Sequence, residues 1–389
     1  MLGAYPSQLI EKLLREGAIH GADKAHVQPS SLDLTLSDDL YEIQGVMLPK
    51  HGETIVDVLR LAQAKKIFFD QPLACKKVYM CRLNEALELP PMIYAYANNK
   101  SSTGRINVQV RVLCDGVPRF DQIPKGYRGD LWIALSPQSF SVKLQPGEAL
   151  NQMRFFSADT RLDVEEHQAL YQAHSLLYHA DGSPYPYNEV DFDDGGGITM
   201  TLDLSQDVVG FVAFPQPDKI LDCSRRDHNP HDFFTPMYRP ENKQLLLNRD
   251  GFYIFSTHEY ISVPPEFSVE MIAYDPTKGE FRTHYAGFFD PGWGYGQKGE
   301  VHGTPAVLEV YPHDHNLIFR DGQPICKMRY ERMATFPDRI YGVNDELRSH
   351  YHTQRGPKLS KYFTNPALQP TPPPAAPALA ATFTSTLST

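Results

Sequence analysis

The chain has 389 residues, of which 41% are hydrophobic and 22% charged. This composition supports a sizeable core and excludes wholesale disorder. A formal net charge of −10 opposes broad electrostatic binding of nucleic acid or anionic membranes. No apolar run approaches the roughly 20 residues of a membrane-spanning helix, and no secretory signal is visible at the start. We therefore expect a cytoplasmic protein that binds neither membranes nor nucleic acid.

The predicted elements are mostly short strands. The first element is a helix over residues 9–17, with Ser7 as its N-cap and Gly17 as its stop. Alternating and β-branched runs follow, separated by Gly, Pro and Asp, and similar runs return in the second half. Between them, residues 164–178 have helical spacing and residues 181–197 are rich in loop formers. These features predict a mainly β protein with a few short helices.

Three blocks of sequence recur in the same order. VYMCRLNEALELPP at 78–91 matches FYIFSTHEYISVPP at 252–265, which aligns Tyr79 with Tyr253 and Glu85 with Glu259. GEALNQMRF at 147–155 matches GQPICKMRY at 322–330, and LDLTLSDD at 32–39 matches MTLDLSQD at 200–207. Ordered repeats at a nearly constant offset indicate two copies of one β-rich fold, fused head to tail.

The repeats set the expected domain limits. We predict an N-terminal copy at residues 1–160, a connector of helix and loop at 161–197, and a C-terminal copy at 198–363. Residues 364–389 are rich in Pro, Ala and Thr and low in charge, so we expect a disordered tail there.

The first candidate site residues lie in the run KSSTGR at 100–105. The hydroxyls of Ser101 and Ser102, a glycine, and the cations Lys100 and Arg105 together suit an anion such as a phosphate chain. The run lacks the G-x-x-x-x-G-K-[ST] pattern of a P-loop. A solvated turn after a strand has the same composition, so the run alone leaves both interpretations open.

The second candidate is Glu309, which interrupts the apolar strand run AVLEVY at 306–311. Burying a lone carboxylate is costly, so it requires a partner, a raised pKa or a function. The aligned residue of the first copy is Ala134. One copy thus has a carboxylate where the other has a methyl group, which favours a functional role over an outward-facing strand residue.

The third candidate is the basic segment YHTQRGPKLSK at 351–361. Its composition fits both a lid that folds over a ligand and a surface tail. No metal site is expected, because H-x-E at 51–53 lacks the P-C-x-x-C partner of zinc deaminases. The five cysteines are odd in number and include no C-x-x-C pair, which indicates reduced, structural thiols.

Taken together and in order, these stretches resemble the dCTP deaminase family of the dUTPase-like superfamily, and more closely its double-length members. The family's I-x-x-L-x-x-G-x-I helix is similar to residues 10–19, and its Q-P-x-S-x-D-L-x-L motif matches residues 28–36. Its R-S-S-x-x-R loop matches residues 100–105, with Lys in place of the first Arg. Its D-P-G-W hairpin, its L-E strand and its closing Y-x-x-Q-x-G-x-x-x-S-[RK] match residues 290–293, 308–309 and 351–361.

The resemblance implies two tandem dUTPase-like distorted β-barrels and the hydrolytic deamination of dCTP to dUTP and ammonia, without a metal at the reacting carbon. It implies that Glu309 takes a proton from water and passes it toward the departing amine, with Ser101 and Arg105 completing the catalytic set. No cofactor is implied beyond the Mg²⁺ that accompanies the triphosphate. The implied substrate-binding residues are Lys100, Ser102, Asp290, Trp293, Tyr351, Gln354, Lys358 and Lys361.

The two copies lose complementary parts. The first has the hydroxyl loop and lacks the carboxylate, whereas the second has the carboxylate and carries YDPTKG at 274–279 in place of the loop. Family sites lie between the subunits of a trimer. The resemblance therefore implies a homo-oligomer and a composite site that pairs Ser101 and Arg105 with Glu309, within or between chains.

Two departures from the family pattern keep alternatives open. Gly287 and Phe288 stand where family members place His-Arg, so one basic contact is absent or supplied elsewhere. The run YRGD at 127–130 resembles the dUTPase hairpin, and Asp121 is a candidate remnant of the dUTPase water-activating aspartate. A dUTP or dCTP diphosphatase, alone or combined with a deaminase, is therefore an alternative, and an inactive nucleotide-binding regulator is another.

Overall fold

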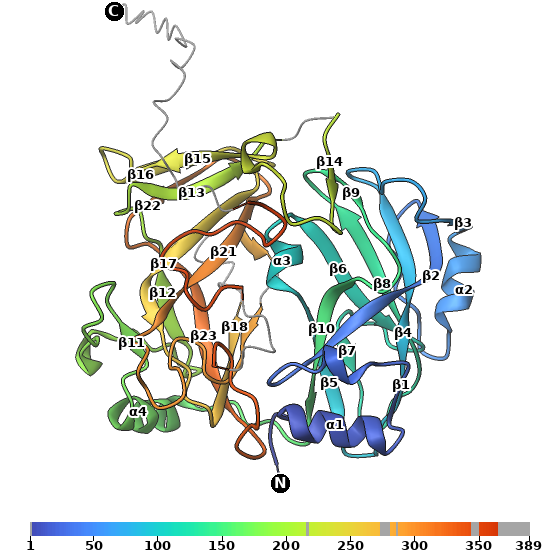
Figure 1. Ribbon diagram of the computed structural model, residues 1–389, viewed down its shortest axis with the longest axis horizontal. Helices are drawn as coiled ribbons and strands as arrows, with labels where there is room; N and C mark the ends of the chain where they lie inside the picture. The colour runs from blue at the N-terminus through green and yellow to red at the C-terminus, as the bar shows by residue number, and fades with distance from the viewer. Residues whose placement is uncertain (1, 215–217, 273–280, 285–286, 344–349, 365–389) are drawn as a thin grey trace, which may run out of the picture.

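The computed structural model describes residues 2–214, 218–272, 281–284, 287–343 and 350–364. Its first half contains α1 (Ser7–Arg15), β1 (Ile19–His20), β2 (Leu32–Ile43), α2 (Ile55–Leu61), β3 (Lys65–Ile67), β4 (Val78–Glu88), β5 (Tyr94–Asn99), α3 (Ser101–Gly104), β6 (Val108–Cys114), β7 (Gln122–Ile123), β8 (Arg128–Pro137), β9 (Ser141–Lys143) and β10 (Ala149–Phe156). Its second half contains α4 (Val164–Ala173), β11 (Leu177–Tyr178), β12 (Ile198–Thr201), β13 (Val208–Ala213), β14 (Ile220–Asp222), β15 (Phe234–Tyr238), β16 (Gln244–Leu247), β17 (Tyr253–Ile261), β18 (Phe267–Ile272), β19 (Phe281–His284), β20 (Phe288–Phe289), β21 (Thr304–Pro312), β22 (Leu317–Arg320) and β23 (Pro324–Arg332). The predicted mainly β fold with few short helices is confirmed, and the two halves lie side by side (Figure 1).

The two halves repeat one strand order. In the first half, neighbouring strands follow the path β6-β8-β4-β2-β10-β5-β7. In the second half, β19-β21-β17 corresponds to β6-β8-β4, and β12-β23-β18-β20 corresponds to β2-β10-β5-β7. The duplication predicted from the sequence is therefore present in the topology, as two copies of one distorted barrel.

A matching pair of buried carboxylates fixes the alignment of the copies. Glu85 accepts hydrogen bonds from the backbone N (2.9 Å) and Oγ1 (2.7 Å) of Thr35. Glu259 accepts the same two bonds from Thr201, at 2.7 and 2.6 Å. The third sequence block was therefore aligned two residues out of register, since Thr35 corresponds to Thr201. A slip of two residues leaves every side chain on its own face of the strand, so alternation does not reveal it.

Helix α4 has the same place in the second copy as α1 has in the first. Each helix precedes a two-residue strand that pairs with the end of a long strand, β1 with β4 and β11 with β17. This correspondence associates α4 with the second copy, and the domain limits 1–160, 161–197 and 198–363 stay predictions. The capping prediction for α1 is wrong, because Pro6 is the N-cap and Ser7 is the first helical residue.

One face of the barrel is covered differently in the two copies. In the first copy α2 packs on this face, and Trp132 and Ala134 are buried in the same small cluster as Ile55 and Leu59 of α2. Strand pairing places Val307 and Glu309 of β21 at the positions of Trp132 and Ala134. Val307 belongs to the large core cluster shared with the first copy. The face that α2 covers in one copy is therefore the face by which the other copy contacts its twin.

Buried contacts join the copies into one unit. Arg154 on β10 forms an ion pair with Glu331 on β23 at 2.6 Å, and both side chains are almost fully buried. Tyr362 and Phe363, which follow the second barrel, are buried in the core cluster that residues of both copies form. The expected reduced thiols are confirmed, since all five cysteines are free. Among the described residues, no helix combines the length and apolarity needed to cross a bilayer.

Two sequence predictions lie outside the described residues. These are the YDPTKG run at 274–279 and the tail from residue 365 onward. The preceding residue, Thr364, is described, and its backbone N donates to the carbonyl oxygen of His228 at 2.9 Å.

Candidate active site

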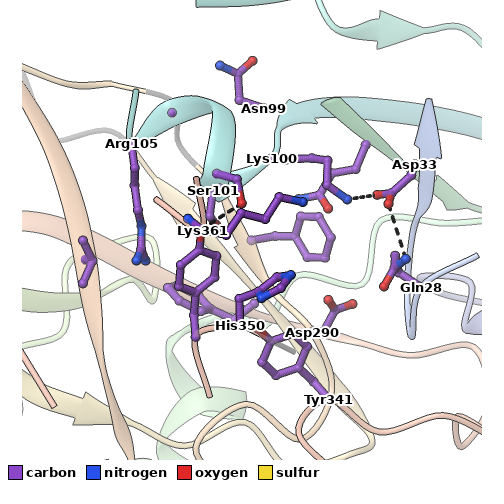
Figure 2. Close-up of a pocket in the computed structure, with 18 of the residues that line it drawn as sticks. Gln28, Asp33, Asn99, Lys100, Ser101, Arg105, Asp290, Tyr341, His350 and Lys361 are labelled. Atoms are coloured by element: carbon purple, nitrogen blue, oxygen red, sulfur yellow. Dashed lines mark hydrogen bonds and ion pairs between the residues drawn. The ribbon is translucent and has the colours of Figure 1, made fainter. Parts of the chain in front are cut away.

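A cavity of about 920 Å³ lies between the two copies. Its wall comes from α3 and neighbouring segments of the first copy, and from β20, β21 and the C-terminal segment of the second. Nine of the eleven predicted site residues line it, namely Lys100, Ser101, Ser102, Arg105, Asp290, Trp293, Glu309, Tyr351 and Lys361. The structure thus places the hydroxyl loop of one copy and the carboxylate of the other in one cavity of a single chain. Figure 2 shows the loop residues Lys100, Ser101 and Arg105 in this cavity.

Glu309 is held in the cavity wall by the pairing of β21 with β17, where it lies opposite Ile254. Its side chain is only 6% exposed. Burial raises the pKa of Glu309 to about 8, although the Arg105 guanidinium and the residue's own backbone N–H act in the opposite direction. The pKa of this carboxyl thus lies near neutral pH, where a group that both takes and gives a proton works best.

The C-terminal segment fixes the direction of Arg105. Its guanidinium donates to Oε1 of Gln354 (3.2 Å) and to the carbonyl oxygen of Lys358 (3.0 Å). It also stacks over the ring of Tyr351, 3.9 Å from the ring centre. The hydroxyls of Ser102 and Tyr351 lie 2.8 Å apart. Residues 351–361, expected to be a lid or a tail, therefore pack against α3 and hold its arginine toward the carboxylate.

Gln354 and Lys358 do not line the cavity. Gln354 is buried and its Nε2 donates to the carbonyl oxygen of Pro305 at 2.7 Å. The ammonium group of Lys358 donates to the carbonyl oxygen of His350 at 2.8 Å. In this structure both residues support the wall through Arg105 and the backbone, and their predicted contact with a ligand stays a prediction.

Asp290 links the hairpin of the second copy to the first copy. Its Oδ1 accepts hydrogen bonds from the backbone N (3.1 Å) and the hydroxyl (2.6 Å) of Ser30. Burial raises the pKa of Asp290 to about 6, while the bonds from Ser30 act to lower it. The turn that follows requires Gly292 at φ +95°, since a Cβ there would lie 2.2 Å from Cγ2 of Ile340. This turn presents Trp293 to the cavity.

One end of the cavity gathers positive charge (Figure 2). Lys100 forms an ion pair with Asp33. Burial, together with Lys100 and Arg226, lowers the pKa of Lys361 to about 8. Burial and the surrounding cations lower the pKa of His350 to about 4. Lys100, Lys361 and Arg226, together with the imidazole of His350, form a site suited to an anion with several charges.

Sequence reasoning missed several lining residues: His26, Gln28, Asp33, Asn99, Gln152, Arg226, Tyr341 and His350. Gln28 and Asp33 stand in the matched Q-P-x-S-x-D motif, where they were given no role. Asp33 accepts a hydrogen bond from Gln28 at 3.4 Å as well as pairing with Lys100. Arg226 and His350 lie in irregular segments that carry no pattern, so only the folded chain could reveal them.

The first-copy residues that resemble those of a dUTPase form hydrogen bonds and an ion pair within the first copy, away from the cavity. Asp121 forms an ion pair with Arg111 at 2.7 Å and accepts a hydrogen bond from the backbone N of Val112. Tyr127 donates to the carbonyl oxygen of Asp130. None of these residues is part of the described cavity lining. In this chain they fix the hairpin of the first copy.

A second polar cluster consists of Asp203, His258 and Asp321, whose ligand atoms lie within 4.8 Å of one another. The carboxylates are already engaged by backbone groups, since Asp203 accepts from the N of Ser205 and Asp321 from the N of Leu204. His258 lies 2.8 Å from Asp321. These bonds connect strands and turns of the second barrel, and the cluster does not line the cavity.

The fold and the cavity together define the class of protein to which this chain belongs. Two dUTPase-like barrels enclose a cavity lined by a buried carboxyl with a raised pKa and by clustered cations. This is the architecture of an enzyme that acts on nucleotides.

Comparison with known proteins shows the family of enzymes to which this chain belongs. Family models for the N-terminal and C-terminal domains of 2′-deoxycytidine 5′-triphosphate deaminase match residues 1–159 and 164–363. The crystal structure of 2′-deoxycytidine 5′-triphosphate deaminase from Agrobacterium tumefaciens is similar, with a TM-score of 0.79 and 33% identity, over 86% of this chain and 97% of that one. The dUMP-forming dCTP deaminase of Aquifex aeolicus is 28% identical over 155 residues, 39% of this chain and 78% of the relative. The chain belongs to the dCTP deaminase family.

Proposed function

We propose that this enzyme converts dCTP and water to dUTP and ammonia. The observation that carries the proposal is the shared cavity, in which buried Glu309 of one copy lies with Ser101 and Arg105 of the other. The carboxyl end accepts the cytosine ring, and the basic end with Lys100 and Lys361 accepts the phosphates. Family membership supports the proposed reaction.

In the proposed reaction Glu309 carries protons. Its carboxylate accepts one proton as a water oxygen bonds to C4 of cytosine, and it passes this proton to N3. The second water proton then moves by the same carboxylate to the exocyclic amine. The C4–N bond breaks, ammonia leaves, and the oxygen becomes the C4 carbonyl of uracil. Both protons and the oxygen of one water are thereby accounted for.

The environment of Glu309 suits this role. Burial makes its conjugate acid weak, so the carboxylate takes a proton from water at a lower cost than an exposed glutamate. Arg105 opposes the shift and keeps part of the population ionised near neutral pH. We assign Ser101 and Arg105 to orienting the reacting groups, and Asp290, fixed by Ser30, to contacting the sugar and base.

The proposal needs no cofactor for the deamination step. Mg²⁺ enters only as part of the substrate, bound to the triphosphate. Asp33, a carboxylate at the basic end, is engaged by Lys100 and Gln28. We also expect that the chains associate into a homo-oligomer and that the enzyme is cytoplasmic.

One observation favours a second product. The relative from Aquifex aeolicus is described as dUMP-forming, which means that its reaction also releases pyrophosphate. A combined deaminase and diphosphatase is therefore the second candidate. Incubation with dCTP and, separately, with dUTP tests both, with ammonia and pyrophosphate scored independently. Ammonia without pyrophosphate supports the proposed reaction, ammonia together with pyrophosphate supports the second candidate, and the absence of ammonia would contradict both.

A further inference from the structure

The connection between β13 and β15 of the second copy crosses onto the first copy. Its short strand β14 pairs in parallel with β9. The backbone N of Cys223 donates to the carbonyl oxygen of Lys143 at 3.0 Å, and Leu221 is buried in the core cluster that both copies form. The turn after β14 thereby carries Arg226 into the wall of the nucleotide cavity.

The equivalent connection of the first copy packs in a different place. Strands β2 and β3 pair as β13 and β15 do, and the segment between them contains α2. In the first copy this segment covers its own barrel. In the second copy it reaches across the junction and gives the site a side chain that neither copy's motifs contain.

Arg226 has no ion pair with a carboxylate among the residues that the structure describes. Its Nη1 donates to the carbonyl oxygens of Cys223 (2.5 Å) and Arg225 (2.7 Å), and its guanidinium stacks 4.7 Å from the ring centre of Tyr362. These contacts fix the side chain and leave Nη2 and Nε available for a ligand. The adjacent Arg225 instead forms two bonds to Asp227, at 2.9 and 3.0 Å.

The groups around Arg226 are mainly cationic. The positive charges of Arg226 and Lys100 both act to lower the pKa of Lys361 and of His350. The acidic groups near these cations are Asp33, which is paired with Lys100, and Glu148. Burial raises the pKa of Glu148 to about 7, so it supplies only part of a negative charge at neutral pH. Positive groups held this close repel one another, and a bound polyanion would remove that repulsion.

We propose that Arg226 binds the terminal phosphates of the nucleotide and makes the enzyme prefer triphosphates to monophosphates. This inference rests on the proposed function, because it places the cytosine ring at Glu309. A guanidinium binds phosphate oxygens in a bidentate manner, and its fork geometry gives it an advantage over an ammonium group. Arg226 also supplies a cation on a chain whose hairpin has Gly287 and Phe288 in place of a basic pair.

The test compares Arg226→Ala with Arg225→Ala. Both variants remove an exposed arginine from the same turn, but only Arg226 lines the cavity. For Arg226→Ala, we expect the KM for dCTP to rise about 10- to 100-fold with little change in kcat, and the KM for dCMP to stay at the wild-type value. Arg225→Ala is expected to behave as wild type. Equal effects on dCTP and dCMP, or equal effects of the two variants, would overturn the inference.

Calorimetric titration with inorganic tripolyphosphate separates this inference from the proposed function. We expect Arg226→Ala to bind tripolyphosphate about 10-fold or more weakly than Arg225→Ala, and Arg226→Lys to be intermediate. This result in an enzyme that fails to deaminate dCTP would refute the proposed function and keep the phosphate assignment. Wild-type affinity in Arg226→Ala would refute the phosphate assignment whether or not dCTP is deaminated. Thermal unfolding of each variant verifies that the fold is intact.

Discussion

The two copies of the barrel keep the same structural residues and divide the site residues. The hydroxyl of Tyr79 accepts a hydrogen bond from the backbone N of Ala74, and Tyr253 makes the same contact with Asn248. The carboxylates Glu85 and Glu259 likewise have the same partners. Residues that hold the barrel together are thus required twice, once in each copy.

The site residues, in contrast, are each present in only one of the two copies. Glu309 faces the cavity from the second copy, whereas Ala134 lies under α2 at the same position of the first. The β2–β3 connection covers this face of the first copy, and the β13–β15 connection extends the second copy onto its twin. A carboxylate present in only one copy is therefore a sign of chemistry, and a carboxylate present in both is a sign of folding.

The largest expected effect concerns Glu309. Glu309→Gln is expected to lower the rate of dCTP deamination by about 10²- to 10⁴-fold, because the amide does not accept a proton from water, with nucleotide binding retained. The rate of ammonia release and the Kd for dCTP measure the two effects. The control is Glu259→Gln, which removes a structural carboxylate. Wild-type turnover of Glu309→Gln would contradict its assignment.

The next effect is on the junction between the copies. Arg154→Met should lower the free energy of unfolding by about 3–5 kcal/mol, because it leaves Glu331 buried without its partner. Chemical denaturation measures the loss. The control is Glu166→Gln, which breaks the exposed Arg332–Glu166 pair and is expected to cost less than about 1 kcal/mol. Similar losses in the two variants would show that the buried pair does not join the copies.

A smaller effect tests the structural carboxylates. Glu85→Gln and Glu259→Gln each weaken the bonds from a threonine and are expected to cost about 1–3 kcal/mol of stability in both copies alike. Urea denaturation of each variant measures the cost. Strongly unequal losses would mean that the two sites are not equivalent, despite their matching contacts.

The last prediction concerns the pH dependence of stability at Glu309. Its folded pKa of about 8 exceeds the ordinary value of 4.5, so the native state binds more protons than the unfolded state between these values. Stability contributed by this group is therefore present below pH 4.5 and is lost as pH rises through about 8. Glu309→Gln removes this pH dependence, so its free energy of unfolding relative to wild type should increase from pH 5 to pH 8, by about 3 kcal/mol. A difference that does not change with pH would contradict the shifted pKa.

Local patterns in the sequence predicted the duplicated fold and the carboxylate of the site. The repeat blocks predicted the duplication, and the pairing of Glu309 with Ala134 in the alignment singled out the carboxylate before any contact was known. These predictions succeed because strand periodicity and motif order are local properties of the chain. The two-residue error in the third block has the same origin, since a local pattern of period two does not distinguish such registers.

The rest of the site depends on contacts between distant segments. Arg226 enters the cavity because β14 pairs with a strand of the other copy, and His350 enters it because residues 351–361 pack on α3. Gln354 is turned toward Arg105 and Pro305, and its predicted contact with substrate stays a prediction. No spacing in the sequence encodes these arrangements, because each depends on how two barrels meet.

The central claim is that one chain contains a complete site made from both of its copies. Co-expression of Glu309→Gln chains with Arg105→Met chains tests it most directly, with the folding of each variant verified separately. If the site lies within one chain, each chain of the mixture has one defect, and ammonia release from dCTP stays at the level of the separate variants. Recovery of a substantial fraction of wild-type activity in the mixture would show that the two halves of the site come from different chains.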